Sequence, residues 1–199
     1  MENRFETLLS EYSEAVDAAH RESLERQLWQ EFGAERAVLV MDLSRFSTLT
    51  EKYGIVYNLS IIRRMQRTVR PLIEAAGGRV VKFEADNCFA MFEGVPPAIQ
   101  ASIAIHRAFQ EINSYMGSAF EIRVGIGIDY GRVLLIGGND YFGLTVNRAS
   151  KLGEDLAEAG DILVTEAAFR QLPSGSDIHS TPLVSTVSGM DLSLFRILY

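Results

Sequence analysis

Apolar residues recur along the chain with two different spacings, one helical and one extended. Steps of three and four residues predict a lead-in helix over 1–34 and long helices over 55–76 and 96–116. Short apolar runs between turn-forming residues predict strands, and adjacent strands fall between the helices. This order favours an α+β fold with a largely antiparallel central sheet and helices packed on one face, and it argues against a doubly wound parallel sheet.

The remaining elements follow from the same pattern. Strands are expected at 36–42, 120–129, 133–136, 161–165 and within 183–198, and shorter helices at 44–53, 142–157 and 166–171. The amphipathic lead-in 1–34 is expected to dock on its own domain or on another copy of the chain. We expect two parts, this helical lead-in over 1–34 and a second domain over 35–199.

The stretch RVVKFEADNCFAMF, residues 79–92, predicts a hairpin of two strands joined by a tight turn. In an extended segment alternate side chains share a face, so Lys82, Glu84 and Asp86 lie together. Three charged groups on a sheet face need partners, solvent or a ligand. A solvated face with a surface ion pair is one interpretation, and a binding site is the other.

Composition limits the classes of function. The 199 residues include 47% hydrophobic and 23% charged residues, which suits a globular domain with one sizeable core. The net charge of −7 gives no support for nucleic-acid binding, and no apolar run is long enough for a transmembrane helix. The single cysteine, Cys88, fits a reducing compartment, so we expect a cytoplasmic protein.

Two aspartates stand at the ends of predicted strands. Asp42 closes the first buried strand and Asp86 lies in the hairpin turn. If those strands are neighbours, the two carboxylates converge into an oxygen-donor site for Mg²⁺ or Mn²⁺, usually completed by substrate phosphates. Asp42 could instead simply cap the following helix.

Further polar residues suit a nucleotide. Asp140 follows the turn Gly137-Gly138, and Asn147 and Lys151 lie four residues apart on one face of a predicted helix. Together with Lys82 and the two aspartates, these acceptors, donors and cations would suit a nucleoside triphosphate.

Three blocks carry a resemblance to a known family. VLVMDLSRFSTLTE, VVKFEADNCFAMF and RVGIGIDYGRVLLIGGNDYFGLTVNRASKL resemble successive signature segments of class III nucleotidyl cyclases, and the similarity covers roughly residues 36–198. The resemblance implies a ferredoxin-like cyclase fold. It also implies that Asp42 and Asp86 bind two divalent cations, Mg²⁺ or Mn²⁺. Lys82 and Asp140 resemble the pair that recognises adenine.

The resemblance implies roles for two more residues and for a partner chain. Asn147 resembles the asparagine that orients the ribose, and Lys151 occupies the position of an arginine that stabilises the transition state. The implied activity is conversion of ATP to 3′,5′-cyclic AMP and pyrophosphate. Sites of this family form between head-to-tail protomers, so a homodimer is expected to be required.

Several positions depart from the family pattern. Lys151 lacks the planar fork of arginine, and Arg148, three residues before it, points in a different direction on an ideal helix and is a poor substitute. Arg45 replaces a small glycine beside Asp42 and could reach the triphosphate or obstruct it. Ala85 replaces a glycine where the turn favours positive φ. The LVSTVSGMD segment has no cation where the family often has a phosphate-binding lysine.

Two alternatives to an active adenylate cyclase stay open. The chain could be a catalytically weak or inactive module that binds nucleotide or a partner in signalling. The GGNDYF sequence is also superficially similar to the loop of diguanylate cyclases, but that loop belongs in the central hairpin, where this chain has EAD.

Overall fold

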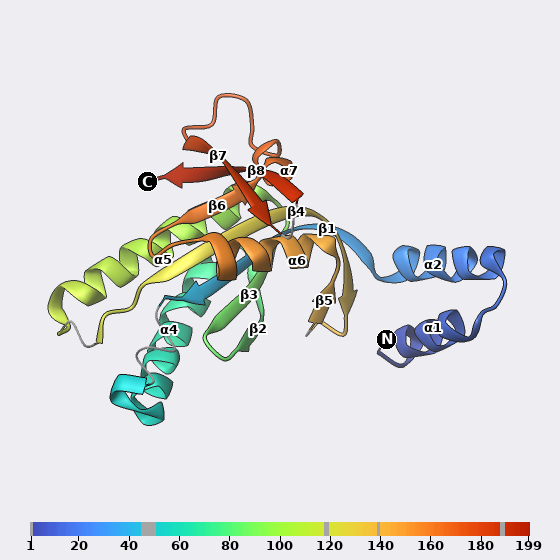
Figure 1. The fold of residues 1–199 in the computed structure, drawn as a ribbon, viewed down its shortest axis with the longest axis horizontal. Helices are drawn as coiled ribbons and strands as arrows, with labels where there is room; N and C mark the ends of the chain where they lie inside the picture. Colours follow the sequence, from blue (N-terminus) through green and yellow to red (C-terminus); the bar gives the residue numbers. More distant parts are fainter. Residues whose placement is uncertain (1, 45–50, 118–119, 139, 188–189) are drawn as a thin grey trace.

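One mixed sheet organises most of the molecule (Figure 1). The computed structural model describes residues 2–44, 51–117, 120–138, 140–187 and 190–199. The strand order is β2-β3-β1-β4-β6-β8-β7, with β5 paired to β4. The β4–β6 pair is parallel and the other pairs are antiparallel. The predicted α+β class with a largely antiparallel sheet is therefore confirmed.

The elements have the following bounds. The strands are β1 Gly33–Leu43, β2 Arg79–Glu84, β3 Asn87–Phe92, β4 Val124–Ile136, β5 Asp140–Phe142, β6 Ile162–Thr165, β7 His179–Val187 and β8 Met190–Leu198. The helices are α1 Glu2–Glu14, α2 Ala18–Phe32, α4 Ile55–Ala75, α5 Val95–Tyr115, α6 Leu144–Ser150, the π-helix η2 Lys151–Leu156, and α7 Glu166–Phe169.

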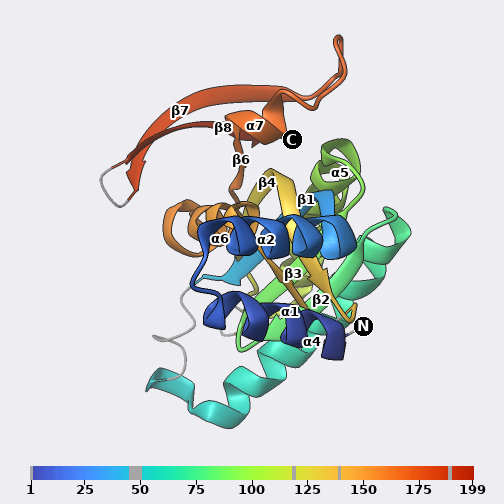
Figure 2. The ribbon, with the colours of Figure 1, turned by 90° about the vertical axis from the view of Figure 1, so that its right-hand side faces the viewer.

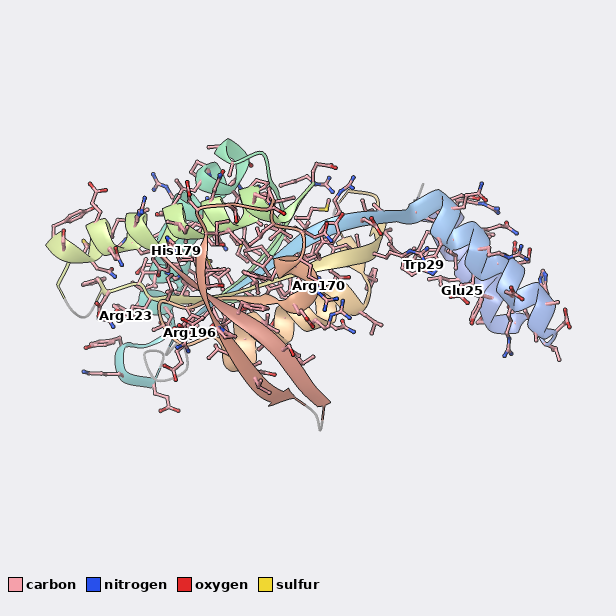
Figure 3. All side chains as sticks on the ribbon, turned by 90° about the horizontal axis from the view of Figure 1, so that it is seen from above. Glu25, Trp29, Arg123, Arg170, His179 and Arg196 are labelled. Carbon is pink, nitrogen blue, oxygen red and sulfur yellow. The ribbon has the colours of Figure 1, made fainter. Side chains whose placement is uncertain are left out.

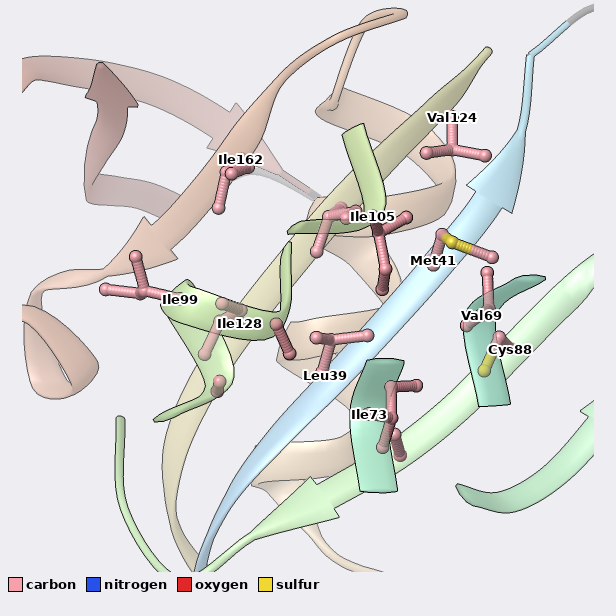
Figure 4. Packing of buried hydrophobic residues seen from close by; sticks show 14 of the residues in the cluster. Leu39, Met41, Val69, Ile73, Cys88, Ile99, Ile105, Val124, Ile128 and Ile162 are labelled. Atoms are coloured by element: carbon pink, nitrogen blue, oxygen red, sulfur yellow. The ribbon is translucent and has the colours of Figure 1, made fainter. Parts of the chain in front are cut away.

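The main core lies between the sheet and the two long helices α4 and α5 (Figure 4). Alternate residues of β1, including Leu39 and Met41, are fully buried against Val69 and Ile73 of α4 and neighbouring apolar groups of α5. The intervening residues Val38 and Val40 face the other way, where they pack with Ala149 of α6. The period of two along β1 thus divides an apolar strand between two packed layers.

Three predicted boundaries were wrong, and a fourth falls mostly outside the described residues. The lead-in 1–34 is two helices, because Asp17 caps α2 by accepting a hydrogen bond from the His20 amide. The predicted strands at 120–129 and 133–136 form one strand, β4, and the helix predicted from residue 142 begins at Leu144 after the short strand β5. Of the helix predicted at 44–53, residues 51–53 are helical and 45–50 lie outside the described residues.

The two N-terminal helices lie side by side and extend away from the sheet (Figures 1 and 2). Their apolar faces meet each other and Ile136 of β4, with Phe5 and Phe32 in an edge-to-face contact. Trp29 lies on the side of α2 nearest the sheet, and the Arg132 guanidinium lies 4.1 Å from its ring centroid (Figure 3). The lead-in therefore docks on its own chain at β4. The proposed division at residues 34 and 35 stays a prediction.

Candidate functional site

The β2–β3 hairpin positions the charged residues predicted from its sequence. A bulge at Val81 shifts the register, so that Lys82 lies opposite Phe89 and its ammonium lies 5.3 Å from the ring centroid. Ala85 occupies the turn with a φ of +49°, which is the left-handed conformation that glycine adopts more easily. The positive φ expected at Ala85 is therefore confirmed.

Asp42 and Asp86 come together, as predicted from strand adjacency. Strand β1 pairs with β3 up to Met41 and Cys88, so Asp42 at the end of β1 lies beside the hairpin turn that carries Asp86. Their carboxyl groups share a hydrogen bond. Burial, followed by the charges of Asp86 and Glu154, raises the pKa of Asp42 to about 7. Burial also raises the pKa of Asp86.

This carboxyl pair has the chemistry of a hard-cation site. Two carboxylates this close repel one another when both are ionised, so a proton or a cation between them relieves the repulsion. Among the described residues, no group of three or more His, Cys, Asp or Glu side chains is arranged to hold a metal. A site with only two carboxylates fits Mg²⁺ or Mn²⁺, which take remaining ligands from water and phosphates.

Lys82 and Asp140 also meet, although 58 positions separate them in the sequence. Strand β5 folds back against β4, and the Lys82 ammonium lies 3.3 Å from the Asp140 carboxylate and 3.4 Å from Glu84. Burial alone would lower the pKa of Lys82, but these two carboxylates outweigh it and raise the pKa. The structure therefore brings together the two residues, one cation and one acceptor, that the sequence suggested for base recognition.

Asn147 and Lys151 are both exposed where α6 continues into η2. The Lys151 ammonium lies 2.5 Å from the carboxylate of Asp155, one turn further along. Among the described residues, no ion pair joins Lys151 to either of the two pairs above, and its carboxylate partner is Asp155. Arg45 lies outside the described residues.

A buried ion pair fixes α6 on the sheet, and the sequence patterns did not reveal it. Asp129 of β4 is fully buried and accepts hydrogen bonds from Arg148 at 2.6 Å and from Thr165 at 2.5 Å. Arg148 is therefore held against the sheet by its ion pair with Asp129. An aspartate at the end of an apolar run was the available signal, but its partners lie 19 and 36 residues away.

Close backbone contact also holds η2 against the sheet. A Cβ atom on Gly153 would lie 2.4 Å from the carbonyl oxygen of Val40, and one on Gly127 would lie 2.4 Å from the Gly153 amide. These glycines let η2 lie directly over β1 and β4. As a result Glu154 lies near Asp42, close enough for its charge to act on that carboxyl group.

One cavity lies away from these residues. It has a volume of about 460 Å³, is lined in part by His106, Phe109 and Tyr199, and includes none of the predicted site residues. His106 stacks on Tyr199, and burial lowers the pKa of His106 to about 4. The imidazole is therefore neutral at pH 7, in keeping with a structural role.

Sequence comparison identifies similar proteins. The family model for the adenylate and guanylate cyclase catalytic domain matches residues 33–188. An uncharacterized protein of Mycobacterium tuberculosis is 29% identical over 150 residues, which are 75% of this chain and 37% of that protein. The chain thus spans well under half the length of this relative.

Solved structures share the fold. An adenylate/guanylate cyclase/hydrolase from Silicibacter pomeroyi superposes with a TM-score of 0.69 at 26% identity, covering 84% of this chain and 98% of that one. The guanylate cyclase domain of RhGC from Catenaria anguillulae, solved with GTP, gives a TM-score of 0.70 at 15% identity, covering 82% and 96%. Within the described ranges, no helix is both long and apolar enough to cross a bilayer.

Proposed function

Because the chain belongs to the adenylate and guanylate cyclase catalytic domain family, we propose that it converts ATP to 3′,5′-cyclic AMP and pyrophosphate. The observation that carries the choice of ATP is the Lys82–Asp140 pair. Lysine can donate to a ring nitrogen of adenine while aspartate accepts from its exocyclic amine. Guanine presents the opposite pattern at these two positions, so the pair favours adenine.

The proposed chemistry is attack of the ribose 3′-hydroxyl on the α-phosphorus. Asp42 and Asp86 would hold two divalent cations, Mg²⁺ or Mn²⁺, which supply charge neutralisation and lower the pKa of the attacking hydroxyl. Lys82 and Asp140 would fix the base, and Asn147 the ribose. Lys151 would place a positive charge near the developing negative charge on the phosphate. Placement and electrostatics would therefore supply most of the rate.

The proposed site is shared between two head-to-tail copies of the chain. One copy would supply Asp42 and Asp86, and the other would supply Lys82, Asp140 and the residues of α6. Support comes from the exposure of Asn147 and Lys151, whose side chains are open to a second copy of the chain.

A complementation experiment tests both the activity and the shared site. We expect Asp42→Ala and Lys82→Ala each to lose cyclic AMP formation from Mn²⁺-ATP by about 100-fold or more. In mixed dimers one of the two sites would carry both substitutions and the other none. Equal mixing of the two inactive variants should therefore restore about one quarter of wild-type activity.

The controls separate the outcomes of this experiment. Glu93→Gln, an exposed charge change directly after β3, should leave the rate unchanged. GTP tested in parallel should give a much lower rate than ATP. Failure of the mixed variants to recover activity, when subunits are shown to exchange, would refute the shared site.

The runner-up is a module that binds nucleotide without turnover. The observation that favours it is Lys151, which replaces an arginine and is already paired with Asp155. Nucleotide binding by the wild-type dimer with no detectable cyclic AMP or cyclic GMP would establish this alternative.

A further inference from the structure

Asn87 begins β3 directly across from Asp42. The β1–β3 register runs from Ala37 opposite Phe92 to Met41 opposite Cys88. One further step along the same antiparallel ladder places Asn87 opposite Asp42. Opposed residues in such a ladder project to the same face, with Cβ atoms about 5 Å apart. That face is the one on which the neighbours Val40 and Phe89 pack together.

The side-chain oxygen of Asn87 has an unusual environment. Within the described part of the chain, Asn87 Oδ1 is buried and has no hydrogen-bond partner. Leaving a polar atom buried and unpartnered typically costs about 1–3 kcal/mol, and native structures contain few such atoms. An unpartnered acceptor on the residue that the register places opposite Asp42 is available to a cation held by Asp42 and Asp86.

We propose that Asn87 Oδ1 is a third protein ligand for the cation held by Asp42 and Asp86, an inference that rests on the proposed function. An amide oxygen is a hard, neutral donor of the kind that Mg²⁺ and Mn²⁺ accept. Being neutral, it completes a coordination shell without adding a third negative charge to a pair that already repels. A carboxylate at the same position would add that repulsion.

Removing Asn87 Oδ1 should change the stability of the protein in opposite directions without metal and with metal. Asn87→Leu has a similar volume and eliminates the unpartnered acceptor. Without metal, this variant should be as stable as the wild type or more stable. With Mn²⁺, it should lose most of the stabilisation that cation binding gives to the folded state.

The experiment measures Mn²⁺ binding directly, without nucleotide. Thermal melting over a range of Mn²⁺ concentrations is combined with electron paramagnetic resonance of free Mn²⁺. Asn87→Leu should weaken Mn²⁺ binding about 10–100-fold, the range found when a supporting group of a metal site is removed. Asn87→Asp keeps an oxygen donor at this position and should bind Mn²⁺ at least as tightly as the wild type at alkaline pH. Glu93→Gln, directly after β3, is the matched control and should bind Mn²⁺ as the wild type does.

The outcomes distinguish this inference from the proposed function. If Asp42→Ala loses Mn²⁺ binding and Asn87→Leu binds as tightly as the wild type, the ligand role of Asn87 is refuted and the metal site stands. If neither the wild type nor any variant binds Mn²⁺, both proposals fail. Should Asn87→Leu not fold, Asn87→Ala is measured in its place and must show the same loss.

Discussion

Replacing Asp42 with asparagine should make the metal-free protein more stable while it abolishes catalysis. The carboxyl group of Asp42 is half-buried beside Asp86, and its pKa rises from an ordinary 3.8 to about 7. The folded protein therefore holds a proton on Asp42 that the unfolded chain releases between these pH values. Asparagine has a similar shape and carries no charge, so it removes this dependence on pH.

The sign follows from proton linkage. Where the folded state binds more protons than the unfolded state, stability falls as pH rises. The contribution of protonated Asp42 to the free energy of unfolding is thus fully present below pH 3.8 and is lost between pH 3.8 and about 7. Above that range the effect of Asp42 no longer changes with pH. The difference between Asp42→Asn and the wild type should be near zero at pH 4 and largest at pH 8.

The magnitude is set by the same rise in pKa. At about 1.4 kcal/mol for each pH unit, the full rise would correspond to a ceiling of about 4 kcal/mol. Solvent reaches part of this carboxyl group and screens its interactions. We therefore expect Asp42→Asn to gain about 1–2 kcal/mol in free energy of unfolding at pH 8.

Urea unfolding followed by circular dichroism, in the presence of a chelator at pH 4, 6 and 8, measures this difference. Glu93→Gln is the control for loss of one negative charge and should show no such trend. A metal-free Asp42→Asn protein that is less stable than the wild type at pH 8, or equally stable at every pH, would refute the reasoning. If Asp42 holds the cation as proposed, saturating Mn²⁺ should stabilise the wild type more than Asp42→Asn and reverse the order.

Three other substitutions test separate parts of the structure. Lys151→Arg restores a planar donor and should raise the rate of cyclic AMP formation by roughly 10–1000-fold; an unchanged or lower rate argues against a catalytic role for Lys151. Asp129→Asn leaves Arg148 without its buried partner and should cost about 2–4 kcal/mol in urea unfolding, and a cost below about 1 kcal/mol would contradict this. Ala85→Gly relieves a positive φ and should add about 0.5–1 kcal/mol, seen as a higher melting temperature; a lower one would count against strain at this turn.

The sequence predicted the contacts that depend on strand order and turns. The apolar runs ending at Asp42 and flanking Asp86 were strong enough to place both carboxyl groups at one edge. The hairpin and the long helices α4 and α5 were found within a residue or two of their ends. These features have local causes, namely the alternation of apolar and polar residues in strands, glycine pairs that end helices, and proline at the start of a helix.

Features that depend on distant partners could not be predicted in the same way. The sequence around Asp129 did not indicate that Arg148 would form an ion pair with it or that Thr165 would donate a hydrogen bond to it. Glu154 lies near Asp42 because η2 changes the helical period, and a regular helix would turn that side chain elsewhere. Asn87 fitted the expected turn chemistry, so its place in β3 opposite Asp42 became visible only from the register.

The continuity between α2 and β1 has a mechanical consequence. Helix α2 ends at Phe32, and β1 begins at the next residue and continues past Asp42, about 30 Å away at the usual rise of a strand. Eleven residues of β1 are in register with β4, and slipping by one residue would turn every side chain to the wrong face. A push or twist on α2 therefore cannot be absorbed by sliding along the sheet. It must tilt β1 and β4 together as one stiff unit, whose far end carries the Asp42 carboxyl group.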